Sequence, residues 1–193
     1  MKPAVAHFYW SHLHQAVRVL DLGCGMGDLG RYKLGAEQVY GLDHNRALLA
    51  YAEKFETVQE WNLDSPEPLP FPDAYFDGVV AKDILEHLSK PWQAVAEIKR
   101  VTRSEGTILA SVICERGRRT WNDYTHVRGF TMHSARQMFA DAGLKVTAVW
   151  RMGGIPLTSR LDAIWLVPFL LRFPLFDWLW TSSYELKAIK LPN

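Results

Sequence analysis

Short apolar runs alternate with stretches of helical periodicity along the first part of the chain. Between the runs, Asp28 and Asn45 are placed to cap helices, Pro91 to open one and Gly35 to end one. Strands and helices that alternate at this spacing predict successive βαβ units, and therefore a parallel sheet with helices on both faces. Five runs have the length and composition of a buried strand: 17–22, 38–42, 58–61, 76–81 and 107–113.

The pattern changes beyond residue 113. A basic and aromatic loop over 115–130 precedes a helix that Thr131 can cap and Gly143 can end. Strand-like segments follow at 144–150 and 183–190. No stretch has the composition of a linker, so we expect one domain with a single core.

Glycines cluster directly after the first expected strand. Asp21 opens the run DLGCGMG, whose alternating glycines let the backbone turn sharply and approach a ligand closely. In open parallel sheets, ligands bind outside the carboxyl ends of the strands. Asp43 and Asp64 follow two more such ends, and Asp43 is placed to accept hydrogen bonds from both hydroxyls of a ribose.

Two phosphate-binding motifs are alternatives for the glycine cluster. Residues 25–30 formally match the dinucleotide pattern G-x-G-x-x-G, but a pyrophosphate there would meet the carboxylates of Asp21 and Asp28. Those carboxylates favour a cationic sulfonium ligand over an anionic phosphate. A P-loop is excluded because no Gly-Lys-Ser/Thr follows the glycines.

Five segments occur in the order typical of class I methyltransferases: VLDLGCGMG (19–27), GLDHN (41–45), LPFPDAYFDGVV (69–80), ILEHL (84–88) and EIKRVTRSEG (97–106). Over residues 17–113 the chain therefore resembles these S-adenosylmethionine-dependent enzymes, particularly the ubiquinone- and menaquinone-methyltransferase branch. DYTHVRGFT (123–131) is similar to a segment of some members. The resemblance implies a Rossmann-like, seven-stranded, mostly parallel sheet with an antiparallel last strand. It also implies methyl transfer to a small or medium-sized acceptor.

The resemblance divides the single domain, 1–193, into a cofactor-binding half (17–113) and an acceptor half (114–193). The glycine loop and a lysine after the fourth strand would line the methionine end of S-adenosylmethionine. An aspartate would hold the ribose hydroxyls, and a neighbouring histidine would lie beside the adenine. A leucine and an aspartate after the third strand would flank the adenine. The residues implied at the methionine end are Asp21, Gly23, Gly25 and Lys82. Those implied at the ribose and beside the adenine are Asp43 and His44, and those that flank the adenine are Leu63 and Asp64.

Three side chains are candidate catalytic groups on the acceptor side: His126, His87 and Asp83. An imidazole titrates near neutrality and can orient an acceptor or remove its proton. Each also has a plainer interpretation, since Asp83 can cap a helix and His87 can bond locally. Nearby arginines either form a solvated basic loop or bind an anionic group of the acceptor. They are Arg116, Arg118, Arg119 and Arg128.

The segment 153–182 is rich in tryptophan, phenylalanine, leucine and proline. It would form a cap over the acceptor pocket, a peripheral membrane contact with Arg160 and Arg172 at the headgroups, or a homodimer contact. Its most apolar run, 163–171, is too short to span a bilayer. If the cap and the arginines converge, the acceptor would have an apolar body and an anionic head.

Composition limits the remaining classes of function. A net charge of +1 gives no basic excess for a nucleic-acid partner, so we expect a small-molecule acceptor. Two distant cysteines predict buried thiols in a cytoplasmic protein. A module that senses S-adenosylmethionine without turnover and, less favoured, a nicotinamide-dependent oxidoreductase are the alternatives. No metal is expected.

Overall fold

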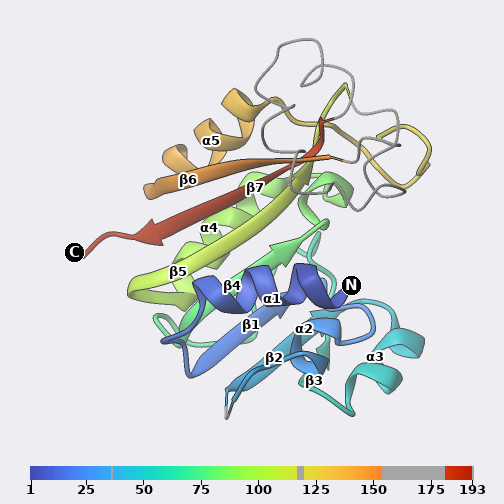
Figure 1. Ribbon diagram of the computed structural model, residues 1–193, viewed down its shortest axis with the longest axis vertical. Coiled ribbons are helices and arrows are strands. Elements are labelled where there is room, and N and C mark those ends of the chain that lie inside the picture. Colours follow the sequence, from blue (N-terminus) through green and yellow to red (C-terminus); the bar gives the residue numbers. More distant parts are fainter. Residues whose placement is uncertain (36, 117–119, 154–180, 193) are drawn as a thin grey trace.

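The computed structural model describes residues 1–35, 37–116, 120–153 and 181–192. They form a seven-stranded sheet in the order β3-β2-β1-β4-β5-β7-β6, with helices on both faces (Figure 1). The strands are β1 Arg18–Leu22, β2 Gln38–Asp43, β3 Thr57–Glu60, β4 Phe76–Lys82, β5 Thr102–Ile113, β6 Leu144–Gly153 and β7 Thr181–Lys190. The helices are α1 Pro3–His12, α2 Asp28–Arg31, α3 Arg46–Ala52, η1 Leu85–His87, α4 Pro91–Val101 and α5 Met132–Asp141.

The strand directions confirm the expected architecture. Strands β1 to β5 pair in parallel, so their carboxyl ends share one edge of the sheet. Strand β7 lies between β5 and β6 and runs antiparallel to both. In the register, Asp21 of β1 pairs with Gly41 of β2, and Lys82 of β4 pairs with Ser111 of β5. This alignment gathers the charged strand ends along the same edge.

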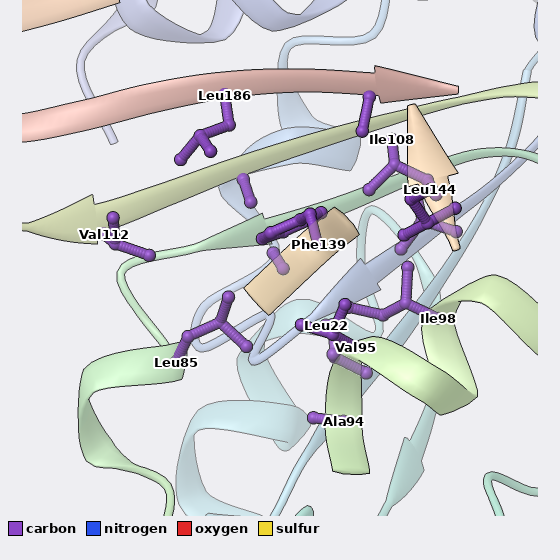
Figure 2. Close-up of a cluster of buried hydrophobic side chains, with 14 of the residues drawn as sticks. Leu22, Leu85, Ala94, Val95, Ile98, Ile108, Val112, Phe139, Leu144 and Leu186 are labelled. Atoms are coloured by element: carbon purple, nitrogen blue, oxygen red, sulfur yellow. The ribbon is translucent and has the colours of Figure 1, made fainter. Parts of the chain in front are cut away.

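Alternate residues of the central strands pack on opposite faces of the sheet, as a pleated strand requires. On one face, α1 buries Tyr9, Trp10 and Leu13 against Val80 and Leu109. On the other face, α4 and α5 pack on a larger cluster, part of which is drawn in Figure 2. That cluster includes Leu22, Val95, Ile98, Ile108, Phe139 and Leu144.

Several expected helix ends are confirmed. The side chain of Asn45 accepts from two backbone N–H groups of α3, and α4 begins at Pro91. Thr131 forms a capping box with Ser134 at the start of α5. After α5, Gly143 adopts a left-handed φ of 76°. The local chemistry of these residues thus fixes where the helices begin and end.

The expected cap and end of α2 and the expected start of β5 are wrong. Asp28 does not cap α2, because Gly27 holds the cap position and the Asp28 carboxylate accepts from the amino group of Met1. The helix ends at Arg31, well before Gly35. Strand β5 also begins at Thr102, earlier than expected, because it follows α4 directly.

Helix α1 was not expected from the sequence. Its buried residues Ala6, Tyr9 and Trp10, with Leu13 just after it, are spaced as one face of a helix. Both cysteines are buried and unpaired, as expected. Among the described residues, no helix is long and apolar enough to cross a membrane. Nearly all of the segment 153–182, with its three alternative roles, lies outside the described residues.

Candidate cofactor site and acceptor-side histidines

The glycine loop after β1 is built on left-handed backbone. Gly23, Gly25 and Gly27 have φ of 75°, 53° and 72°, values that L side chains rarely adopt. A Cβ on Gly23 would lie 2.7 Å from the side chain of Ile84, and one on Gly27 would lie 2.9 Å from the backbone of Ala52. A Cβ on Gly25 would meet nothing within 4 Å. The loop therefore packs tightly at two of its glycines and faces open space at the third.

Asp43 joins the end of β2 to this loop. Its Oδ2 accepts from the backbone N–H of Gly25 at 3.0 Å, and its Oδ1 accepts from the N–H of Asn45 at 2.9 Å. An ionised carboxylate has about four acceptor positions, so each oxygen can take one more donor. The geometry leaves Asp43 able to accept the two hydroxyls of a ribose next to the open side of Gly25.

Asp21 lies near the end of β1, just before the loop. It is 4% exposed, and burial together with the nearby Glu56 carboxyl raises its pKa well above the usual range. Glu56 is 6% exposed, accepts from the N–H of Gly30 at 2.8 Å, and has a pKa raised by burial to about 7. Two carboxyls packed together in a buried place favour a shared proton over two charges. Asp21 is therefore a buried carboxyl group and not an open carboxylate on the surface of the loop.

The residues expected around the adenine are more exposed. The His44 side chain is 79% exposed, with Nδ1 3.7 Å from Oδ1 of Asp43. Leu63 is partly buried against the main core. Asp64 accepts from the backbone N–H of Ser89 at 2.9 Å and from its hydroxyl at 3.3 Å. Leu63, Asp64 and Ser89 line one hollow of about 630 Å³ with Trp61.

Lys82 and Asp83 form an ion pair at the end of β4. Oδ1 of Asp83 also accepts from the Ser111 hydroxyl of β5 at 2.6 Å. The expectation that Asp83 caps a helix is wrong: Asp83 has a left-handed φ of 50°, and η1 has no side-chain cap. Each oxygen of Asp83 thus already accepts from one protein donor, and the carboxylate serves as a counter-ion for Lys82.

His87 and His126, distant in sequence, lie together. Their ring centroids are 4.6 Å apart, and Asp123 lies beside them. His87 ends η1, whereas His126 and Asp123 belong to the loop after β5. Asp83 does not join this cluster, since its partners are Lys82 and Ser111.

The described arginines of the basic loop already have protein partners. Arg116 pairs with Glu115 at 3.1 Å. Arg128 donates to the backbone carbonyl of Ser89 at 2.7 Å and stacks on Trp92. Arg118 and Arg119, the other two candidates for an anionic acceptor group, lie outside the described residues.

Several known proteins similar to this chain are named as methyltransferases. Residues 20–110 match the family model of a methyltransferase domain. A malonyl-[acyl-carrier protein] O-methyltransferase of Erwinia pyrifoliae is 34% identical over 101 residues, which are 52% of this chain and 38% of that protein. A probable S-adenosylmethionine-dependent methyltransferase of Mycolicibacterium smegmatis is 30% identical over 155 residues, 72% of this chain and 60% of that protein. The chain thus spans less than two thirds of the length of either relative.

Structural comparison agrees on the fold. A SAM-dependent methyltransferase from Archaeoglobus fulgidus superposes with a TM-score of 0.78 at 18% identity, over 97% of this chain and 92% of that one. Residues 20–110 thus match a methyltransferase domain, and the chain shares its fold with S-adenosylmethionine-dependent methyltransferases. S-adenosylmethionine is the cofactor of this domain, and the oxidoreductase alternative is not favoured.

Two groups in the methyltransferase domain were missed from the sequence. Glu56 lies in a polar stretch of sequence, and nothing local signals that it is buried against Gly30 of α2 and Gly41 of β2. Asp123 had a detectable signal, because it precedes His126 by three residues and ends up beside it. Ser89 and Ser111, which hold Asp64 and Asp83, carry no pattern that predicts those bonds.

Proposed function

We propose that this protein transfers a methyl group from S-adenosylmethionine to a small or medium-sized acceptor at the carboxyl edge of the sheet. One observation carries the cofactor site: Asp43 is held by the N–H of Gly25, beside the open space that a Cβ at Gly25 would enter. A ribose and its attached chain need this combination of a doubly accepting carboxylate and a close, side-chain-free backbone.

The residues present fit the cofactor. Asp43 would hold the ribose hydroxyls, and Gly23, Gly25 and Lys82 would line the methionine end, near the buried Asp21. His44, Leu63 and Asp64 would lie along the adenine, where the oxygens of Asp64, each with one donor from Ser89, can still accept the adenine amino group. When bound, S-adenosylmethionine supplies an electrophilic methyl group on a sulfonium. The chain's own task is then to align an acceptor with that methyl group and to remove a proton from it where necessary.

The acceptor side would use His126 and His87. Both side chains are only partly exposed, and they lie on segments that follow β4 and β5 at the edge where the cofactor site opens. We propose that this pair positions the acceptor and removes a proton from it where the reaction requires this. Asp83 would act through Lys82, by fixing that ammonium at the strand end.

The acceptor is proposed by chemical class. The acceptor atom would be an oxygen, carbon or nitrogen of a small molecule, and the similarity to a malonyl-[acyl-carrier protein] O-methyltransferase favours oxygen. An acceptor with an apolar body and an anionic head would require Arg118, Arg119 and the segment 153–182 to converge on the acceptor pocket. That segment also remains our proposed place for a membrane or homodimer contact.

The test of turnover separates an enzyme from a sensor. Purified protein is incubated with S-adenosylmethionine labelled on the methyl group and with fractions of small-molecule extract, malonyl-[acyl-carrier protein] included. We expect label to enter at least one acceptor and S-adenosylhomocysteine to form at the same rate. Binding of S-adenosylmethionine without label transfer in any fraction would favour the regulatory module instead.

A further inference from the structure

Three potential metal ligands meet where the loop after β5 contacts η1. They are His87 from η1 and Asp123 and His126 from the loop, and each offers one ligand atom within 4.8 Å of the others. Nε2 of His126 is 3.9 Å from Oδ2 of Asp123. The side chain of His126 is 8% exposed and that of Asp123 is 48% exposed. The cluster is therefore anchored on one side and open to small ions on the other.

Hydrogen bonds fix which ring nitrogen of each histidine is free. Nδ1 of His126 lies 2.6 Å from the carbonyl oxygen of Thr120, which can only accept, so Nδ1 carries the proton. The Thr125 hydroxyl donates to Oδ1 of Asp123 at 2.6 Å, so Nδ1 of His87, at 3.0 Å from that hydroxyl, must donate to it. In the neutral rings both Nε2 atoms then carry lone pairs.

This arrangement is the one that metal-binding histidines require. A ligating histidine usually donates its other N–H to a carbonyl, carboxylate or water, which fixes the tautomer and orients the ring. The carboxylate is oriented in the same way, since Oδ1 of Asp123 accepts from the N–H and the hydroxyl of Thr125. Oδ2 of Asp123 remains for a cation.

The two segments that carry the ligands are tied together independently of any ion. The backbone N–H of Val127 donates to the carbonyl of Glu86 at 3.0 Å, and Arg128 donates to the carbonyl of Ser89 at 2.7 Å. These bonds lie on either side of His87 in sequence. The ligands are therefore brought together by the fold and need little reordering to bind a metal.

We propose that His87, His126 and Asp123 bind one divalent transition metal of the Zn²⁺ type, with at least one coordination position left for an oxygen ligand. Two imidazoles and one carboxylate suit Zn²⁺ and its neighbours, whereas Mg²⁺ and Ca²⁺ prefer oxygen ligands. Three protein ligands with an open position are typical of a metal that binds water or substrate. On the proposed function, the open position accepts an oxygen of the methyl acceptor.

The test is calorimetric titration of the metal-free protein with ZnCl₂, and with MgCl₂ in parallel. We expect one equivalent of Zn²⁺ to bind and Mg²⁺ to bind at least 100-fold more weakly. His87→Ala and His126→Ala should abolish the site, and Thr125→Val should weaken it about 10- to 100-fold by removing the bonds that orient two ligands. His133→Ala, an exposed histidine on α5, is the control and should bind Zn²⁺ as the unchanged protein does.

Asp123→Asn covers the case in which a histidine variant fails to fold, because its side chain is half exposed. Thermal unfolding and binding of S-adenosylhomocysteine are measured on every variant. Absence of Zn²⁺ binding, or equal binding in Asp123→Asn and His133→Ala, overturns the metal site while leaving the cofactor site intact. Zn²⁺ binding without binding of S-adenosylhomocysteine would overturn the proposed function and leave the metal site intact.

Discussion

The Asp43 carboxylate accepts a hydrogen bond from the backbone N–H of Gly25 across 3.0 Å, which joins the end of β2 to the loop after β1. The loop reaches Asp43 because β1 and β2 pair in parallel, with Asp21 opposite Gly41 in the register. One carboxylate thereby shapes the loop and still has acceptor positions for a ligand.

Asp43→Ala should weaken binding of S-adenosylmethionine by roughly 10- to 150-fold, because it removes charge-assisted bonds to two ribose hydroxyls worth about 1.5–3 kcal/mol. The protein should still fold, since Asp43 lies at the edge of the sheet. Calorimetric titration of the variant measures this, with Asp141→Ala on α5 as the control. An unchanged dissociation constant for Asp43→Ala would show that this residue does not hold the ribose.

Alanine at two glycines of the loop should have different effects on stability. Gly25→Ala should lower the free energy of unfolding by about 1–3 kcal/mol, which is the cost of a left-handed φ alone. Gly27→Ala should cost more, because its Cβ would also lie 2.9 Å from the backbone of Ala52. Denaturant unfolding compares the two variants. Gly25→Ala should also weaken cofactor binding, because its methyl group enters the open space beside the loop. Binding as tight as that of the wild type would contradict the placement of the cofactor in this space.

The stability of the protein should depend on pH through Glu56. Its pKa in the folded protein is about 7, above the usual value near 4.5, so the folded state favours the protonated form. Protonated Glu56 therefore stabilises the folded state relative to its ionised form by up to about 3 kcal/mol. This contribution is present below pH 4.5 and is lost as the pH rises through 7. Wild type should therefore lose stability between pH 5 and pH 8 relative to Glu56→Gln, which keeps an acceptor for Gly30.

Thermal unfolding of both proteins from pH 5 to pH 8 tests this expectation. Glu53→Gln, an exposed glutamate in the same stretch of chain, is the control and should follow wild type at every pH. Parallel curves for wild type and Glu56→Gln would mean that Glu56 is ionised in the folded protein at pH 5.

Much of the fold follows from local patterns, because caps and strand periodicity act over a few residues. Asn45, Thr131 and Gly143 mark helix ends by chemistry visible in the sequence, and the structure confirms each. The expected strands were also right, apart from their ends. Asp28 and Asp83 failed as caps because Gly27 and Asp83 itself adopt left-handed backbone, which a residue's identity alone does not reveal.

The sequence predicted which strand ends form the site, but it did not predict the contacts between the side chains there. The parallel sheet places Asp43 near the glycine loop, so a motif was enough to bring them together. The cluster of His87, Asp123 and His126 depends on how the loop after β5 folds onto η1, which is a long-range contact. Burial of Glu56 likewise depends on α2 and β2 packing around it, and no sequence pattern reports that.

Tyr9 links α1 to the antiparallel strand. Its hydroxyl donates to Oε2 of Glu185 at 2.5 Å, and both side chains are buried. Tyr9→Phe should lower the free energy of unfolding by about 1–3 kcal/mol, because Glu185 loses a donor in a buried place. Urea unfolding measures the change, with Tyr124→Phe as the control at a tyrosine that is 97% exposed. A loss no larger than the control's would show that water replaces the hydroxyl.

Calorimetric titration of the unmodified protein with S-adenosylmethionine and, separately, with NAD tests the central claim most directly. We predict a micromolar dissociation constant for S-adenosylmethionine, equivalent to a binding free energy of about −8 kcal/mol, and no detectable heat of binding for NAD. Binding of NAD without binding of S-adenosylmethionine would contradict the assignment of the glycine loop and Asp43 to a sulfonium cofactor.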